Sequence, residues 1–213
     1  MRLPAWLLLA WLAAFAGFVV MGALASVEGR FPGDRWLEEQ VQEADGEAFA
    51  KTLDYTAEFG DVPLMVVAAA LAGAVAVRFA GWTDGALVIG TLASRGVNSV
   101  VKEIIERPRP SPSLVHVESQ PSSFSFPSGH AETVIVLFGF IFYLAAVHLK
   151  DPRLRLGVQA ACLWIILVTG VQRVYVGGHW PTDVLGGYYL GALMLAALIA
   201  LHRLVRAGTR GLS

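Results

Sequence analysis

The sequence predicts an all-α, polytopic membrane protein with six membrane-spanning helices, and an amphipathic surface helix between the first and the second. The chain is 55% hydrophobic and only 15% charged, whereas a soluble domain carries about 25% charged residues. Apolar stretches of the length that crosses a bilayer recur along its 213 residues. The basic residues between these stretches gather in alternate connections, as the positive-inside rule requires of a multi-pass protein.

The length and composition also exclude some classes of protein. We expect a single domain, residues 1–213. The net charge of -1 and the absence of a basic tract predict no nucleic-acid partner. The only cysteine, Cys162, lies in an apolar run, which excludes an internal disulfide and a cysteine-based metal site. We expect Cys162 to be a small buried side chain.

Hydropathy marks the six expected spans, of which the third contains polar interruptions. They cover residues 4–27, 62–80, 85–105, 129–149, 154–174 and 182–205. The first span has an alternative interpretation, because Ala23-Leu24-Ala25 resembles a signal-peptidase site and Arg2 could serve as a minimal positive region. Its apolar stretch exceeds the usual length of about 7–15 residues, so we favour a retained helix.

The loops predict the orientation. Residues 28–61 are acidic and carry apolar residues at helical spacing, which is typical of an amphipathic helix on the membrane surface. The opposite side collects a second group of bases, so we expect that side and both termini to be cytoplasmic. These bases are Arg2, Arg78, Lys150, Arg153, Arg155, Arg203, Arg206 and Arg210.

Three polar clusters lie on the expected outward face. In the first, Lys102 ends the third span, and Arg109 lies between two prolines that restrict its backbone. Lys102 or Arg107 alone could be a base that extends to the membrane surface. In the second, Ser128 is a good N-cap for the fourth span, and Gly129 lets an anion approach the unpaired amides of the first turn. A plain cap with an interfacial His130 is the alternative.

The third cluster begins at Arg173 and ends at the start of the sixth span. His179 and Asp183 are four residues apart, so they can meet on one face. A carboxylate bonded to one ring nitrogen leaves the other free as a nucleophile or base. A capping Asp183 with an interfacial histidine is the alternative. Together the clusters offer cations, a helix N-terminus and two histidines, which suit phosphoryl transfer.

In order, the clusters read K-x6-R-P, P-S-G-H and R-x5-H-x3-D. On six spans, this pattern resembles the type 2 phosphatidic acid phosphatase superfamily, whose members share a site with vanadium haloperoxidases. The resemblance implies that His179 is a nucleophile oriented by Asp183, and that His130 is the general acid. It also implies a phosphate site without a metal or other cofactor, formed by Lys102, Arg109, Ser128, Gly129 and Arg173. Gln172 departs from the pattern, because the family often has serine before this arginine.

Several residues outside the three clusters also have expected positions. Arg95, Asn98 and Ser99 share a helical stripe with Lys102, and an arginine at this depth needs a partner. Glu132 could pair with Arg95 or Lys102, or could only complement the helix dipole. We expect His116 to be exposed in a loop, and His148 and His202 to be interfacial at cytoplasmic helix ends. Gly139, Gly186, Gly187 and Gly191 are expected to allow close helix packing.

The sequence therefore predicts a cell-membrane phosphatase whose site faces the periplasm or exterior. The expected partner is a lipid phosphate: phosphatidylglycerophosphate, phosphatidic acid or undecaprenyl diphosphate. One alternative is a lipid phosphotransferase with the same site. Another is a non-catalytic lipid-phosphate binder or transporter, although mere binding needs no oriented nucleophile. The oligomeric state stays open.

Overall fold

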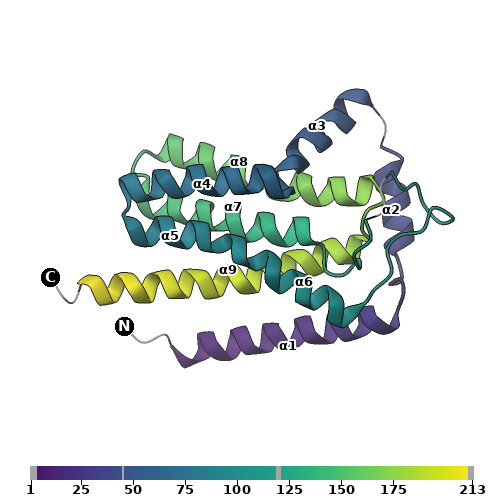
Figure 1. The fold of residues 1–213 in the computed structure, drawn as a ribbon, viewed down its shortest axis with the longest axis horizontal. Coiled ribbons are helices and arrows are strands. Elements are labelled where there is room, and N and C mark those ends of the chain that lie inside the picture. Colours follow the sequence, from purple (N-terminus) through teal and green to yellow (C-terminus); the bar gives the residue numbers. More distant parts are fainter. Residues whose placement is uncertain (1–3, 45, 119–120, 211–213) are drawn as a thin grey trace.

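A computed structural model of the chain describes residues 4–44, 46–118 and 121–210 (Figure 1). Arg2 and the side chain of Arg210, two of the expected cytoplasmic bases, lie outside this description. Every regular element within these residues is helical. The elements are α1 (Ala5–Val27), α2 (Asp34–Gln42), α3 (Glu47–Ala57), α4 (Val62–Phe79), α5 (Trp82–Gly90), α6 (Ser94–Ile105), α7 (Gly129–His148), α8 (Pro152–Tyr175) and α9 (Pro181–Arg210).

Five of these helices are long and apolar enough to cross a membrane: α1, α4, α7, α8 and α9. They agree with five of the six predicted spans. The third predicted span is not one continuous helix, because a 3₁₀ turn at Thr91–Ala93 separates α5 from α6. The Thr91 hydroxyl donates to the carbonyl of Val88 at 2.6 Å, a local bond of the kind that competes with regular helix geometry. α5 and α6 nevertheless run on in one direction along the bundle (Figure 1).

The predicted surface helix is two helices, α2 and α3, at one end of the bundle (Figure 1). On α2 the polar face points inward, with Asp34 and Glu38 buried. Its apolar face points outward, where Trp36 is 64% and Leu37 42% exposed. An inward polar face and an outward aromatic face are the arrangement expected for a helix at the membrane surface.

Helix α7 is the centre of the bundle and packs against both α8 and α9 (Figure 1). The main core gathers apolar side chains of α4, α5, α7 and α8, among them Met65, Val88, Leu137 and Ile166. Cys162 belongs to the same core, as predicted. On α1, α4 and α8 many large apolar side chains stay exposed, as a lipid-facing surface requires.

Glycines bring α7 and α9 together, which confirms the prediction for Gly139, Gly187 and Gly191. A Cβ on Gly187 would collide with the carbonyl oxygen of Ser128, and a Cβ on Gly191 would lie 2.8 Å from the carbonyl oxygen of Glu132. Gly139 faces Leu195, and Gly186 faces the Phe126 ring. Small residues at such a crossing let two backbones approach closely. The first turn of α7 therefore lies directly against the first turns of α9.

A second polar cluster joins the other end of the bundle. The Asp84 carboxylate on α5 lies 2.9 Å from Nε2 of His202 on α9 and 2.7 Å from Nε2 of His148 on α7. Nδ1 of His202 is 3.0 Å from the Tyr143 hydroxyl. The prediction for His202 was wrong, because its side chain is only 1% exposed. Its hydrogen bonds to Asp84 and Tyr143 satisfy the ring inside the bundle, so it needs no water.

The α7–α9 crossing gives a first prediction. Gly187→Ala places a methyl group against the α7 backbone, which cannot yield as a side chain can. We expect a loss of about 1–3 kcal/mol of stability, the usual range for overpacking. Thermal denaturation in detergent measures the change. The control is Gly157→Ala on α8, where a Cβ meets nothing within 4 Å and alanine favours the helix. Equal midpoints for the two variants would contradict the packing argument.

Candidate active site

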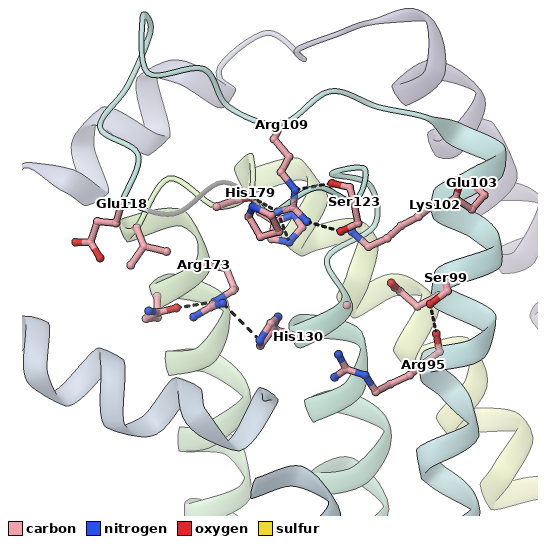
Figure 2. A pocket seen from close by; sticks show the side chains of 16 residues that line it. Arg95, Ser99, Lys102, Glu103, Arg109, Glu118, Ser123, His130, Arg173 and His179 are labelled. Carbon is pink, nitrogen blue, oxygen red and sulfur yellow. Dashed lines mark hydrogen bonds between the residues drawn. The ribbon is translucent and has the colours of Figure 1, made fainter. Parts of the chain in front are cut away.

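The three sequence clusters meet at one end of the bundle. Helices α6 and α8 end there, and α7 and α9 begin there, because neighbouring helices run antiparallel (Figure 1). A cavity of about 410 Å³ opens between these helix ends. Its walls include the predicted site residues Lys102, Arg109, Gly129, His130, Arg173 and His179 (Figure 2). All six were predicted as catalytic or phosphate-binding residues. Five of them can contribute side chains to the cavity, and Gly129 can contribute only its backbone.

Neutral oxygen atoms hold three of the cations that line this cavity. Lys102 Nζ donates to the carbonyl of Phe124 at 2.5 Å. Arg109 donates to the carbonyls of Ser123 at 2.7 Å and Gly178 at 2.5 Å. Arg173 Nε donates to the side-chain oxygen of Gln172 at 2.6 Å. None of these bonds cancels a charge, so the cations keep their attraction for an anion.

Gln172, the departure from the family pattern, thus has a defined position. Its oxygen accepts from Arg173, and its amide donates to Asp54 on α3 at 3.0 Å. The amide is engaged with Asp54, although the residue lines the cavity. Gln172 links the Arg173 guanidinium to α3, and the link holds that guanidinium in place.

His179 follows a tight turn between α8 and α9, in which Gly177 takes a positive φ of 67°. The imidazole is buried. Its Nε2 lies 3.3 Å from an Arg109 nitrogen, which can only donate. Burial, with the positive charges of Lys102 and Arg109, holds the pKa of His179 well below its usual value. The ring is therefore neutral at pH 7 and offers a lone pair on Nε2 toward the cavity.

Asp183 lies behind His179, but the predicted direct hydrogen bond between them does not form. Its Oδ2 is 3.7 Å from Nδ1 of His179. The Ser125 hydroxyl donates to that same carboxylate oxygen and lies 3.4 Å from Nδ1. The backbone amide of Trp180 also donates to it, at 2.9 Å. Ser125 therefore shares the space between imidazole and carboxylate, a contact that the motif spacing did not reveal.

His130 stands on the first turn of α7 and has a partner that the sequence did not predict. Its Nε2 is 2.7 Å from Oδ1 of Asp61, the residue before α4, and 3.4 Å from Arg173. The hydrogen bond with His130 lowers the pKa of Asp61. The only signal in the sequence was an acid directly before the second span. Each of the two histidines thus has a carboxylate within 4 Å.

Arg107 lies inside the protein and not at the membrane surface. It was expected to extend to the membrane surface, yet it is 0% exposed. It lies 2.7 Å from Asp34 on α2 and 2.5 Å from Asp183 on α9. Asp34 also accepts from the backbone amide and the hydroxyl of Thr182, so it caps α9. Arg107 thereby ties the surface helix α2 to the carboxylate behind His179.

Ser128 and Glu132 differ in part from their predictions. Ser128 occupies the N-cap position of α7, but its hydroxyl makes no capping bond. The hydroxyl is buried and has no hydrogen-bond partner in the described part of the chain. Glu132 does not form the suggested ion pair: its carboxylate accepts from Thr133 at 3.2 Å, while Arg95 donates to the Gly60 carbonyl at 3.2 Å.

Glu38 is the most perturbed acid outside the spans. Its side chain is buried, and neither carboxylate oxygen has a hydrogen-bond partner among the described residues. Burial, with the neighbouring carboxylates of Asp34 and Asp183, raises the pKa of Glu38 to about 8. At neutral pH Glu38 is therefore largely a neutral acid, which allows α2 to dock beside two other carboxylates.

The chain is similar to known proteins over the residues that carry the three clusters. A model of the PAP2 superfamily matches residues 85–206. Phosphatidylglycerophosphatase B of Bacillus subtilis is 43% identical over 110 residues, 51% of this chain and 51% of that protein. An undecaprenyl-diphosphatase of Sulfolobus acidocaldarius is 35% identical over 112 residues, 50% of this chain and 48% of that protein. The chain thus spans about half the length of these curated relatives.

A solved structure extends the likeness to nearly the whole chain. The crystal structure of a transmembrane PAP2 type phosphatidylglycerolphosphate phosphatase from Bacillus subtilis matches with a TM-score of 0.77 and 26% identity. The match covers 91% of this chain and 96% of that one. The likeness in fold therefore extends beyond the residues that the family model matches.

The Arg107 ion pairs give a second prediction. Arg107→Met leaves the carboxylates of Asp34 and Asp183 buried without a cation, which costs about 3–5 kcal/mol in comparable pairs. We expect a much lower midpoint of thermal denaturation. The control is Arg35→Met, which removes a pair with Glu39 whose arginine side chain is 51% exposed and whose loss costs about 0–1 kcal/mol. Asp34→Asn combined with Arg107→Met should recover part of the loss. A decrease in midpoint no larger than that of the control would refute a stabilising role for the two Arg107 ion pairs.

Glu38 gives a third prediction. A carboxyl whose folded-state pKa is raised from 4.5 to about 8 destabilises the fold increasingly between these pH values, because the unfolded chain loses its proton first. Glu38→Gln removes that dependence. We expect the variant and the wild type to be similar near pH 5, and the variant to be more stable near pH 8.5. Denaturation midpoints at both pH values provide the test, and a constant difference between them would contradict the burial of a neutral acid.

Proposed function

Because the chain belongs to the PAP2 superfamily, we propose that it is a membrane phosphatase that removes phosphate from a lipid phosphate or diphosphate through a phosphohistidine on His179. One observation carries the proposal. Two histidines, His179 and His130, face one cavity whose cations are held by neutral oxygen atoms (Figure 2). Such a cavity stabilises a multiply charged phosphate and provides both a nucleophile and a proton donor.

In the first step, Nε2 of His179 attacks phosphorus, and the bond from phosphorus to the leaving oxygen breaks. The electron pair of that bond stays on the leaving oxygen, which takes a proton from His130. Lys102, Arg109 and Arg173, with the first-turn amides of α7, stabilise the oxygens of the transferring group. Asp183 and Ser125 hold the imidazole of His179 from behind and stabilise its positive charge.

In the second step, water attacks the phosphohistidine. His130 is now neutral and accepts a proton from the water. The bond between phosphorus and nitrogen breaks, and its electron pair returns to Nε2. Inorganic phosphate leaves, and both histidines regain their first states. Asp61, hydrogen-bonded to His130, holds the imidazole in position for the next cycle.

The protein's own cations do the electrostatic work in this scheme, so we propose a metal-independent reaction. The substrate would be an amphiphile, because the cavity opens where the spans end. The names of the relatives support a phosphatidylglycerophosphate or a prenyl diphosphate. The names of other relatives widen the range to a lipid A phosphate. A phosphotransferase that passes the phosphoryl group to a second lipid would use the same first step.

We propose an outward orientation for the site. Several bases lie at the opposite end of the bundle, among them Arg78, Lys150, Arg153 and Arg203. The segment from α1 to α4 at the site end is instead rich in acids. The positive-inside rule makes that end cytoplasmic. Helix α1 begins and α9 ends there (Figure 1), so both termini would be cytoplasmic and the site would lie at the outer headgroup level.

The mechanism gives a fourth prediction. His179→Ala should lower kcat for phosphate release from a lipid phosphate by about 10³-fold or more, since it removes the proposed attacking nitrogen. The control is His116→Ala, which changes a histidine in an exposed loop. Released phosphate and the thermal midpoint are measured on both variants. Full activity in folded His179→Ala protein would refute the mechanism.

The intermediate can be sought directly in His130→Ala protein. An aryl phosphate has a leaving group that needs no proton, so the first step should proceed while hydrolysis is slowed. We expect a phosphoprotein that is labile in acid and stable in alkali. A second lipid added to the wild-type reaction distinguishes transfer from hydrolysis by the appearance of a new lipid phosphate.

A further inference from the structure

One wall of the cavity continues beyond the proposed phosphate site. Along α6, Lys102, Asn98 and Arg95 follow one another on the face turned toward the cavity. Arg95 is seven residues from Lys102, which is about 10 Å along a helix axis. Figure 2 shows Lys102 level with Arg109 and His179, and Arg95 lower, near His130. The cavity therefore has polar groups on both sides of His130.

Arg95 is a cation with little compensation. Its one hydrogen bond in the described part of the chain goes to the carbonyl of Gly60 at 3.2 Å, and no carboxylate lies within ion-pair distance there. Two carboxylates, Asp61 and Glu132, interact with it only through space, while Asp61 is hydrogen-bonded to His130 and Glu132 accepts from Thr133. An arginine at membrane depth needs an anionic partner or water. The geometry leaves its charge available to a ligand.

Asn98 is an independent sign of a ligand. It is 3% exposed, and its side-chain nitrogen has no hydrogen-bond partner in the part of the chain that the structure describes. The same side chain lies against Gly129, with its oxygen 3.0 Å from the place a Cβ would take. A buried amide without a partner costs free energy unless a bound group completes it. An anionic oxygen in the cavity would complete it.

From these two observations we propose that Arg95 and Asn98 form a second anion subsite, which binds a phosphate carried by the leaving group. The proposal rests on the proposed function. His130 protonates the leaving oxygen, so the rest of the leaving group must lie on the His130 side of the reacting phosphorus. Figure 2 shows Arg95 on that side, and Asn98 lies on the same wall of the cavity, between Arg95 and Lys102 along α6.

The subsite determines a substrate class. When a lipid diphosphate reacts, the leaving group is a lipid monophosphate. When phosphatidylglycerophosphate reacts, the leaving group is phosphatidylglycerol, a phosphodiester. Both leaving groups therefore carry an anionic phosphorus group. A simple lipid monophosphate leaves as a neutral alcohol and gains nothing from Arg95. The guanidinium would also stabilise the charge that grows on the leaving phosphate in the transition state.

Two matched substrate pairs test the proposal on one preparation. The first pair is a prenyl diphosphate and the prenyl monophosphate of the same chain. The second is phosphatidylglycerophosphate and phosphatidic acid with the same acyl chains. For each pair, the ratio of kcat/KM is measured for the wild type, Arg95→Met, Arg95→Lys and Asn98→Ala. Arg78→Met, at the opposite end of α4, is the control for loss of an arginine.

We expect Arg95→Met to lower the ratio by about 100-fold for at least one pair, the usual effect of removing a group that stabilises a developing anion. Arg95→Lys should restore part of the ratio, Asn98→Ala should lower it less, and Arg78→Met should not change it. The pair that responds identifies the spacing of the two phosphorus groups. Equal losses for both members of each pair, or no change in either ratio, would overturn the subsite.

A binding measurement separates this inference from the proposed function. If the wild type releases phosphate from no substrate, the proposed function fails. The subsite is then tested by binding to His179→Ala protein in lipid nanodiscs. Tighter binding of the prenyl diphosphate than of the monophosphate, lost on adding Arg95→Met, supports the subsite. Equal binding of the two lipids overturns it.

Discussion

The two ion pairs of Arg107 hold together parts of the chain that are far apart in sequence. Arg107 joins Asp34 on α2 to Asp183 at the start of α9, inside the protein and away from water. Asp34 in turn caps α9 through Thr182. Asp183 and Ser125 face Nδ1 of His179, so these contacts also position its imidazole. The position of the proposed nucleophile thus depends on a surface helix that contributes no atom to the cavity.

Charge is divided between structure and ligand in a consistent way. Arg107 is paired with carboxylates and has no attraction left for an anion. Lys102, Arg109 and Arg173 are held by carbonyl or amide oxygens, which fix their positions without cancelling their charge. Had carboxylates held these three, a phosphate would have to displace them. The choice of neutral acceptors leaves this cluster of cations able to attract an anion.

The sequence predicted the residues of the three clusters, because each cluster is a short motif at the end or start of one expected span. It did not predict their distant partners. Asp34 and Asp61 reach the site from α2 and from the start of α4, and no local spacing encodes that register. Average hydropathy found the third span, but the break at Thr91 depends on one hydroxyl bonded to a carbonyl. His202 was misjudged because its partner, Asp84, lies more than a hundred residues away.

Helix α2 has one further consequence. Its inner face is fastened by Asp34, but its outer face, with Trp36 and Leu37, is completed only by the surrounding lipid. Lipid headgroups would therefore lie against the helix that holds Arg107 and, through it, Asp183 behind His179. An amphiphile that replaces native lipid around this helix would act on the proposed site as well as on the solvent around it. The composition of the bilayer then becomes a variable of the proposed reaction, in the same sense as ionic strength is for a protein in water.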